Sequence, residues 1–136
     1  MKTVQKDAWE RVQRVSVYNS TRQTRYPSIA RTANGTLLVL FTRQTEEQKL
    51  AGRGDLLVAR SKDNGETWGE PIVVLESQAG ELRAIGTLTA LRSGRLIAPF
   101  TELSKGQVTS EVRLLSSDDA GVSWEVIEIE SDAPLA

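Results

Sequence analysis

The chain of 136 residues contains no cysteine and no histidine. Without cysteine it can form neither disulfides nor thiolate metal sites. Without histidine it lacks the commonest metal ligand and the usual general base near neutral pH. Any chemistry must therefore come from Asp, Glu, Tyr, Lys, Ser, Thr or Arg side chains, and we expect neither a metal nor a cofactor.

A strong charge of one sign and long apolar runs are also missing. The formal net charge of −1 gives no reason to expect nucleic acid or an anionic membrane as a partner. No stretch approaches the roughly 20 apolar residues of a membrane span. Residues 1–10 have no apolar core of the kind found in secretory signals, so the chain as given is expected to be cytoplasmic. With 39% hydrophobic and 26% charged residues, the composition is typical of a soluble globular protein.

What the sequence does contain is an internal repeat. The octapeptide of residues 61–68 recurs as residues 117–124, which lie 56 positions further along, and both copies fit Ser-x-Asp-x-Gly-x-Thr/Ser-Trp. Each copy follows a short apolar run, so the repeated unit is larger than the motif itself. The constrained positions are Ser61, Asp63, Gly65, Thr67 and Trp68 in the first copy and Ser117, Asp119, Gly121, Ser123 and Trp124 in the second.

Apolar runs and turn signals divide the chain into two similar units. In the first unit the Asn34-Gly35 turn separates two predicted strands, because Asn-Gly adopts positive φ at little cost. Each unit is predicted to be a four-stranded antiparallel meander of about 50 residues, which is typical of one β-propeller blade. The predicted strands are 28–32, 36–42, 55–60 and 71–75 in the first unit and 86–91, 95–101, 111–116 and 124–129 in the second, with polar loops at 43–54 and 102–109.

These units suggest a division of the chain into three parts. Residues 25–80 form the first predicted blade and residues 81–136 the second. In the N-terminal segment 1–24, Trp9, Val12 and Val15 have the threefold spacing of a short helix, but the alternating run Val15-Ser16-Val17-Tyr18 favours a strand that closes the last blade of a propeller. The fold class predicted from the sequence is therefore all-β, built of propeller blades.

The repeated octapeptide is expected to have a structural role. Its glycines supply a permissive backbone, and its Asp carboxylates can accept backbone N–H bonds within a turn. Its Trp side chains offer large apolar faces that can pack between sheets. The alternative is a joint metal or substrate site built from Asp63 and Asp119, but two separated turns on an outer rim are poorly placed to form one.

The octapeptides resemble the Asp box, the BNR repeat of sialidases (neuraminidases) and related propellers. Segment 24–29, Thr-Arg-Tyr-Pro-Ser-Ile, resembles the Arg-Ile-Pro motif that opens the first sialidase blade. Segment 34–38, Arg43 and segments 54–56 and 60–61 also follow the family order, so the resemblance covers about 25–130. It implies the first two blades of a six-bladed propeller that hydrolyses terminal sialic acids with retention.

The resemblance also implies site residues. Sialidases grip the substrate carboxylate with three arginines, and the planar guanidinium suits that contact. By position, Arg25 matches the first of these arginines, and Arg43 matches an additional arginine near the acid/base loop. Arg83 in the second unit lies near the equivalent of Arg25 and is a further candidate for substrate binding. The expected partner is a glycan with a terminal anionic sugar.

The sequence departs from the family pattern in two ways. The loop after Arg43 contains no Asp where sialidases place their acid/base residue, so Glu46 and Glu47 are the remaining carboxylates that could donate a proton. The tyrosine nucleophile, its glutamate partner and the other two arginines belong to later blades. We therefore expect the isolated chain to be inactive on sialosides. The alternative function is a non-catalytic carbohydrate-binding or scaffold propeller that has lost its acid.

Two blades on their own leave sheet faces uncovered. Stacked repeats generally need at least about three units for stability. Exposed apolar faces of this kind favour association. We therefore expect self-association through the open blade faces, for instance as three copies in a ring, or the presence of further blades in a longer chain.

Overall fold

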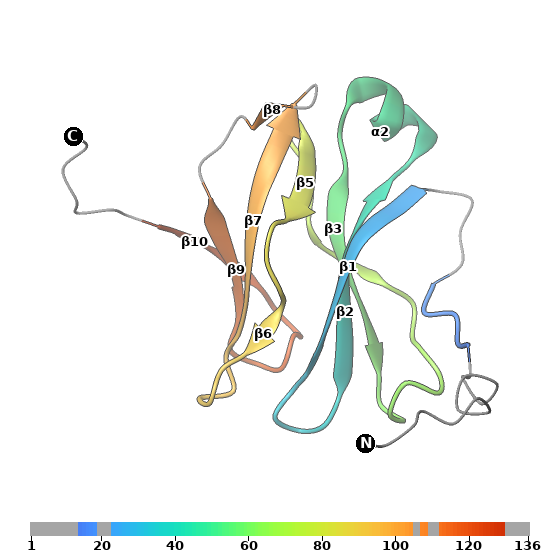
Figure 1. The fold of residues 1–136 in the computed structure, drawn as a ribbon, viewed down its shortest axis with the longest axis vertical. Helices are drawn as coiled ribbons and strands as arrows, with labels where there is room; N and C mark the ends of the chain where they lie inside the picture. Colours follow the sequence, from blue (N-terminus) through green and yellow to red (C-terminus); the bar gives the residue numbers. More distant parts are fainter. Residues whose placement is uncertain (1–13, 19–22, 105–106, 109–111, 130–136) are drawn as a thin grey trace, which may run out of the picture.

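Two antiparallel sheets contain the strands of the described chain, which comprises residues 14–18, 23–104, 107–108 and 112–129 in this computed structural model. The first sheet has four strands in sequence order, whereas the second has six. The first contains β1 (Gln23–Arg31), β2 (Leu37–Gln44), β3 (Asp55–Ser61) and β4 (Ile72–Leu75). The second contains β5 (Glu81–Ala84), β6 (Thr89–Ala90), β7 (Leu96–Ser104), β8 (Gln107–Val108), β9 (Arg113–Ser117) and β10 (Glu125–Glu128). Figure 1 shows the two sheets side by side, with β5 of the second sheet next to β2 and β3 of the first.

The central strands of the first sheet are buried on both faces. In β2, residues Leu38 to Thr42 are all buried, as the continuous apolar run predicts. Because successive side chains point to opposite faces, Leu38 and Leu40 face the second sheet while Val39 and Phe41 face away from it. The first sheet therefore contributes to two separate apolar clusters.

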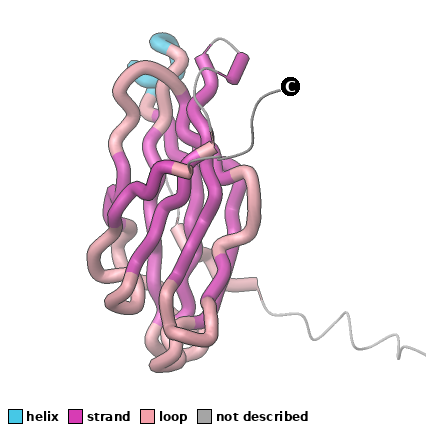
Figure 2. Tube along the Cα trace, turned by 90° about the vertical axis from the view of Figure 1, so that its left-hand side faces the viewer, coloured by secondary structure: helices cyan, strands magenta, loops and turns pink. Residues whose placement is uncertain are grey.

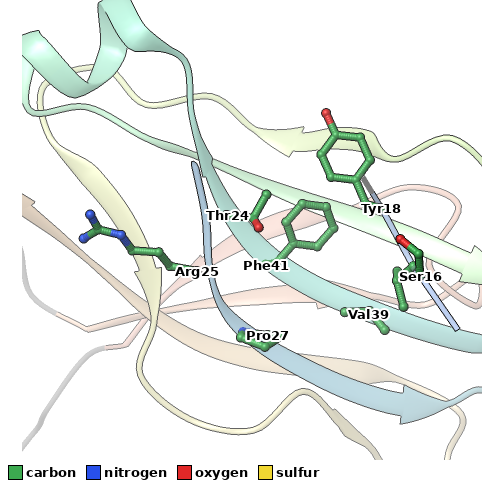
Figure 3. Close-up of a pocket in the computed structure, with 8 residues that line it drawn as sticks. Ser16, Tyr18, Thr24, Arg25, Pro27, Val39 and Phe41 are labelled. Atoms are coloured by element: carbon green, nitrogen blue, oxygen red, sulfur yellow. The ribbon is translucent and has the colours of Figure 1, made fainter. Parts of the chain in front are cut away.

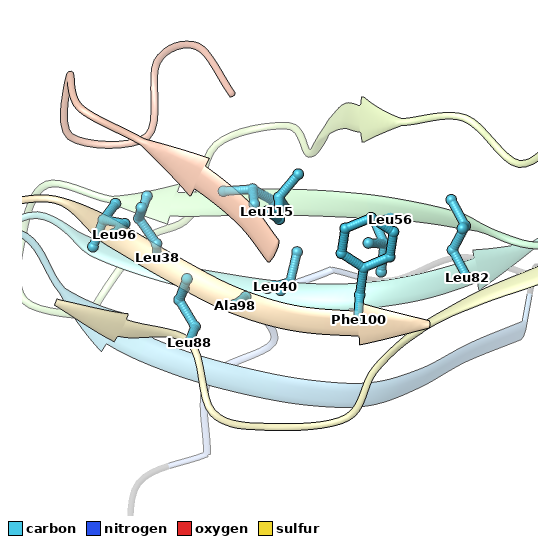
Figure 4. Packing of buried hydrophobic residues seen from close by; sticks show 10 residues of the cluster. Leu38, Leu40, Leu56, Leu82, Leu88, Leu96, Ala98, Phe100 and Leu115 are labelled. Atoms are coloured by element: carbon cyan, nitrogen blue, oxygen red, sulfur yellow. The ribbon is translucent and has the colours of Figure 1, made fainter. Parts of the chain in front are cut away.

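The larger cluster holds the two sheets together (Figure 4). Leucines of the first sheet interlock there with Phe100 and Leu115 of the second sheet, and both of these side chains are at most 1% exposed. The smaller cluster lies on the opposite face of the first sheet, where Val17, Tyr18 and Trp68 pack against buried residues of β2 and β3. Its buried members are Val39, Phe41, Leu57 and Ala59.

The strands run between two different ends of the molecule. The end formed by segments 45–54 and 76–80 and by the first residues of β1 and β5 is here called the loop end. The opposite end, formed by the turns 32–36, 61–69, 91–95 and 117–124, is called the turn end. Figure 2 shows the helix at the loop end and the tight turns at the other. Since consecutive strands are antiparallel, both octapeptides lie at the turn end.

The segment predicted as a polar loop at 43–54 instead contains a short helix, α2 (Glu46–Ala51). Thr45 caps this helix: its hydroxyl accepts from the backbone N–H of Gln48 at 3.0 Å, and the Gln48 side chain accepts from the Thr45 backbone N–H at 2.9 Å. Gly52 ends the helix in the left-handed conformation, with φ of 70°. A reciprocal capping box and a C-terminal glycine are local helix signals that outweigh the polar composition.

The first strand of the second sheet also differs from the prediction of 86–91. It begins earlier, as β5, and resumes as β6 after an interruption at 85–88. The interruption lies opposite Pro99 of β7, which has no N–H to donate to a neighbouring strand. There, the backbone N–H of Ile85 still donates to the Pro99 carbonyl at 3.0 Å, and a Cβ on Gly86 would lie 3.2 Å from Pro99 Cγ.

The prediction of an all-β fold made of two antiparallel blades is confirmed. Counting β5 and β6 as one broken strand, the path through the second sheet also has four positions, and β8 is an addition at the edge of β7. Residues 14–18 form no strand and pack on the smaller cluster through Val17 and Tyr18. The rest of the N-terminal segment lies outside the described residues, so its role as a closing strand stays a prediction.

Candidate functional site

The first octapeptide forms a closed hydrogen-bond network within its own turn. The Asp63 carboxylate accepts from the Ser61 hydroxyl at 2.8 Å, from the backbone N–H of Thr67 at 2.8 Å and from the Thr67 hydroxyl. The indole N–H of Trp68 donates to the carbonyl of Gly65 at 3.0 Å. These bonds stabilise the charged carboxylate, the Thr67 hydroxyl most of all, and they lower the pKa of Asp63 to about 2.

The second octapeptide repeats these hydrogen bonds, and its Asp119 carboxylate also accepts from the backbone N–H of Val122 at 3.1 Å. Asp119 accepts from the hydroxyl of Ser117 at 2.8 Å, from the backbone N–H of Ser123 at 2.8 Å and from the Ser123 hydroxyl. The Trp124 indole donates to the Gly121 carbonyl at 3.0 Å. The pKa of Asp119 is likewise lowered to about 2, with the Ser123 hydroxyl as the largest cause. Both carboxylates are therefore engaged within their own turns.

Arg25 lies at the loop end, near the start of β1. Arg25 is half-buried and lies opposite Thr42 in the β1–β2 register. It borders a cavity of about 360 Å³ that is lined mainly by apolar side chains. In Figure 3 its guanidinium points away from Phe41 and Tyr18, the aromatic side chains of that cavity. Within the described part of the chain, the guanidinium makes no hydrogen bond or ion pair, so its charge is available to a ligand.

Arg43 leaves the first sheet on the face opposite to Arg25. It pairs with Thr24, one position before Arg25, and side chains alternate between the two faces of a sheet. Its Nη1 donates to the Tyr18 hydroxyl at 3.4 Å, and its buried Nε has no hydrogen-bond partner in the part of the chain that the structure describes. The structure therefore brings Arg25 and Arg43 to the same end but does not bring their guanidinium groups to one face.

Arg83 projects from β5 toward the start of β1. Its Nε and Nη2 donate to the two carboxylate oxygens of Glu81 at 3.0 and 3.1 Å, and these bonds raise the pKa of Arg83 above its ordinary value. The guanidinium carbon also lies 4.9 Å from the centre of the Tyr26 ring. Arg83 thus links β5 to Tyr26 of β1, the residue that follows Arg25 in the sequence.

Glu46 and Glu47 occupy the first turn of α2, and both are exposed. Carboxylates at this position interact favourably with the helix dipole, which gives them a structural role whatever else they do. Neither makes a hydrogen bond or ion pair with another described residue. Their assignment as proton donors stays a prediction.

Comparison with known proteins places this arrangement in a family. The sequence matches the BNR repeat-like domain over residues 1–134. The chain belongs to the BNR repeat-like domain family. No curated protein matches it.

Solved structures share the fold of this BNR domain. One is a protein of unknown function from Dyadobacter fermentans DSM 18053, with 22% identity and a TM-score of 0.65 over 79% of this chain. Another is the Hadza microbial sialidase Hz136, with 21% identity and a TM-score of 0.58 over 76% of this chain. The matches cover 36% and 25% of those two chains, respectively, so this BNR domain corresponds to a minor part of each.

Several polar residues at the loop end of the BNR domain were not found from the sequence. Asp55 is only 8% exposed, and its carboxylate accepts from the Gln48 side chain and from the backbone N–H of Ser77, both at 2.8 Å. It therefore anchors α2 and the segment after β4. Glu81 is 7% exposed and accepts from the Gln44 side chain at 3.4 Å.

Two sequence signals could have revealed part of this network. Thr45-x-x-Gln48 is a capping-box pattern, which predicts the helix that carries Gln48. Glu81-x-Arg83 has the i, i+2 spacing that places two side chains on one side of a strand. No local signal predicts that Arg83 lies over Tyr26.

The described ranges contain no group of three or more acidic side chains placed to hold a metal ion. No helix among these residues has the length and hydropathy needed to cross a membrane.

Proposed function

We propose that this BNR domain belongs to a sialidase-like glycoside hydrolase, in which its loop end binds the carboxylate of a terminal sugar acid. Arg25 carries the proposal, because it is a half-buried arginine at the loop end whose guanidinium has no partner among the described residues. A planar guanidinium binds a carboxylate through two parallel N–H···O bonds. The fold shared with a microbial sialidase supports this assignment.

In this proposal the domain supplies one part of a larger hydrolytic site. Cleavage of a glycosidic bond requires an acid that protonates the leaving oxygen. Glu46 and Glu47 are the proposed donors, since they follow β2 directly and lie at the same end as Arg25. The nucleophile and the remaining carboxylate ligands would come from residues outside this chain.

A second function, non-catalytic carbohydrate binding, is favoured by one specific observation. Both candidate acids are exposed in the first turn of a capped helix, where their carboxylates stabilise the helix and remain solvated. A general acid usually needs a raised pKa, which burial or a neighbouring carboxylate provides. In this second function the domain binds the glycan carboxylate through Arg25 and does not hydrolyse the glycan.

Both functions include the binding of a sugar carboxylate at Arg25, and the ligand affinities of the 136-residue chain test this binding. The probes are N-acetylneuraminic acid and its uncharged methyl ester, and chemical-shift titration reads their affinities. We expect the acid to bind roughly ten times more tightly, because a charge-assisted hydrogen-bond pair is worth about 1.5–3 kcal/mol. Arg25→Met should reduce this preference to about one.

The matched control is Arg92→Met, which removes an exposed arginine from the turn end. It should leave the affinities for both probes unchanged. Equal affinities of the native chain for acid and ester would contradict the proposed function. An unchanged preference in Arg25→Met would show that another group binds the carboxylate.

A further inference from the structure

Tyr26 has an unusual backbone for a large side chain. Its φ is 56°, a left-handed conformation that is uncommon outside glycine, asparagine and aspartate. It lies in a β-bulge, because β1 advances three residues from Arg25 to Ser28 while β2 advances only two, from Thr42 to Leu40. Bulges of this kind redirect a side chain and occur often beside functional sites.

The redirected ring lies between the two sheets at the loop end. One face is covered by the Arg83 guanidinium, yet Tyr26 remains 40% exposed. Within the described part of the chain its phenol hydroxyl has no hydrogen-bond partner. Tyr26, the residue after Arg25, therefore offers both apolar ring surface and a polar hydroxyl at the loop end.

Arg83 is held rigidly in its place over the ring. Glu81 engages its Nε and Nη2, and Gln44 of the first sheet in turn donates to Glu81 at 3.4 Å. The side chains of Arg83 and Glu81 are 26% and 9% exposed, so the ion pair is partly withdrawn from water. The remaining nitrogen of the Arg83 guanidinium, Nη1, has no hydrogen-bond partner among the described residues.

The charges divide the loop end into two parts. Arg25 has no carboxylate partner among the described residues, whereas the charge of Arg83 is compensated by Glu81. A second ligand carboxylate at Arg83 would face the repulsion of Glu81. Neutral hydroxyl groups would instead hydrogen-bond to Nη1 of Arg83 and to the Tyr26 phenol at little electrostatic cost.

We infer that Tyr26 and Arg83 form a second subsite, which contacts the uncharged, hydroxyl-bearing part of a sugar acid whose carboxylate lies at Arg25. This inference rests on the proposed function. In it, Tyr26 and Arg83 touch the ligand, while Glu81 and Gln44 are positioning residues that fix the Arg83 guanidinium. The class of ligand is a monoanionic sugar with adjacent hydroxyl groups.

N-acetylneuraminic acid and its methyl ester also test the subsite. The two probes share the same hydroxyl-bearing sugar and differ only in the charge of the carboxyl group, so a contact to the sugar affects both and a contact to the carboxylate affects only the acid. Arg83→Met alone would leave the Glu81 carboxylate uncompensated beside the site, so this variant is combined with Glu81→Gln. The double variant should weaken the acid and the methyl ester alike, by roughly threefold to tenfold, as expected for one lost hydrogen bond. The ratio of the two affinities should stay as in the native chain. Tyr26→Asn should act in the same direction, and asparagine tolerates the left-handed backbone, so the fold is preserved.

Two further variants separate contact from positioning. Arg83→Lys retains a cation over the ring but loses the fork that engages Glu81, so it should restore only part of the affinity. Arg92→Met is again the control and should change nothing. Circular dichroism of each variant confirms that the fold is intact.

The possible results distinguish this inference from the proposed function. Unchanged affinities in both the Arg83→Met/Glu81→Gln double variant and Tyr26→Asn would overturn the subsite alone. A collapse of the acid-to-ester ratio in the double variant, where no uncompensated Glu81 charge remains, would show that Arg83 binds the carboxylate, which also overturns it. Equal affinities of the native chain for acid and ester would overturn the proposed function, and the subsite with it.

Discussion

The two sheets are alike at the turn end of the molecule and differ at the loop end. At the turn end the octapeptides of both sheets form the same hydrogen bonds, with corresponding distances that agree closely. At the loop end the sheets diverge: α2 follows β2 in the first, while a short strand, β8, pairs with the end of β7 in the second. The repeated end maintains the fold, and the divergent end carries the candidate ligand groups.

The turn end itself contains a second contrast. Gly121 of the second octapeptide is buried against the first sheet, and its carbonyl accepts from Arg60 Nη2 at 2.7 Å. Gly65 of the first octapeptide is half-buried and has only Leu37 of its own sheet within 3.4 Å of a Cβ position. The internal hydrogen bonds of the two turns are alike, but among the described residues only the second turn joins two sheets. This difference can be measured by equivalent substitutions.

The largest effect on stability is expected for Gly121→Ala. The added Cβ would lie 2.5 Å from a methyl group of the fully buried Leu38, and the φ of 86° already disfavours alanine. Overpacking and backbone strain together should cost about 2–5 kcal/mol. Urea unfolding measures this loss of the free energy of unfolding.

Gly65→Ala is the matched control. Its φ is 90°, so it carries a similar backbone strain without the buried clash. It should cost about 1–2 kcal/mol. Equal losses in the two variants would show that the second octapeptide does not pack against the first sheet as described.

A smaller and more uniform effect is expected from acid. The folded-state pKa of Asp63 and Asp119 is about 2, below the ordinary value of 3.8. The carboxylates therefore contribute stability that is fully present above pH 3.8 and is lost as the pH falls through 2. NMR titration of the two carboxyl groups should give matching values.

The asparagine variants sharpen this comparison. Asp63→Asn and Asp119→Asn remove the titrating groups, so each should flatten the acid dependence of stability by a similar amount. If only one of the two native carboxyl groups titrated near its ordinary pKa, the two turns would not have equivalent networks.

The sequence predicts the turn end better than the loop end for a physical reason. All partners of Asp63 lie within residues 61–67, so local spacing is sufficient to define the network. The contact between Tyr26 and Arg83 joins two sheets across 57 residues of sequence. It also depends on a bulge in which Tyr26 adopts a positive φ, and a tyrosine in the sequence does not predict a positive φ. The interruption opposite Pro99 likewise depends on which strand pairs with it.

The helix α2 lies between these extremes. Its capping residues, Thr45 and Gln48, are readable in the sequence, but the short segment has no apolar face that would mark a helix. Arg25 was identified through a motif resemblance, whereas its lack of a described partner and its proximity to Tyr26 came only from the structure. A residue's position in a motif therefore predicts that it is a candidate for the site, whereas its contacts depend on the packing of the folded chain.

The most direct test of this account is to locate the ligand on the protein. Amide chemical shifts of the 136-residue chain can be followed during titration with N-acetylneuraminic acid. We predict that the shifts concentrate at the loop end, around Arg25, Tyr26 and Arg83, and leave the two octapeptides unperturbed. Shifts centred on Asp63 and Asp119 at the turn end would contradict the division of the molecule into a structural end and a ligand-binding end.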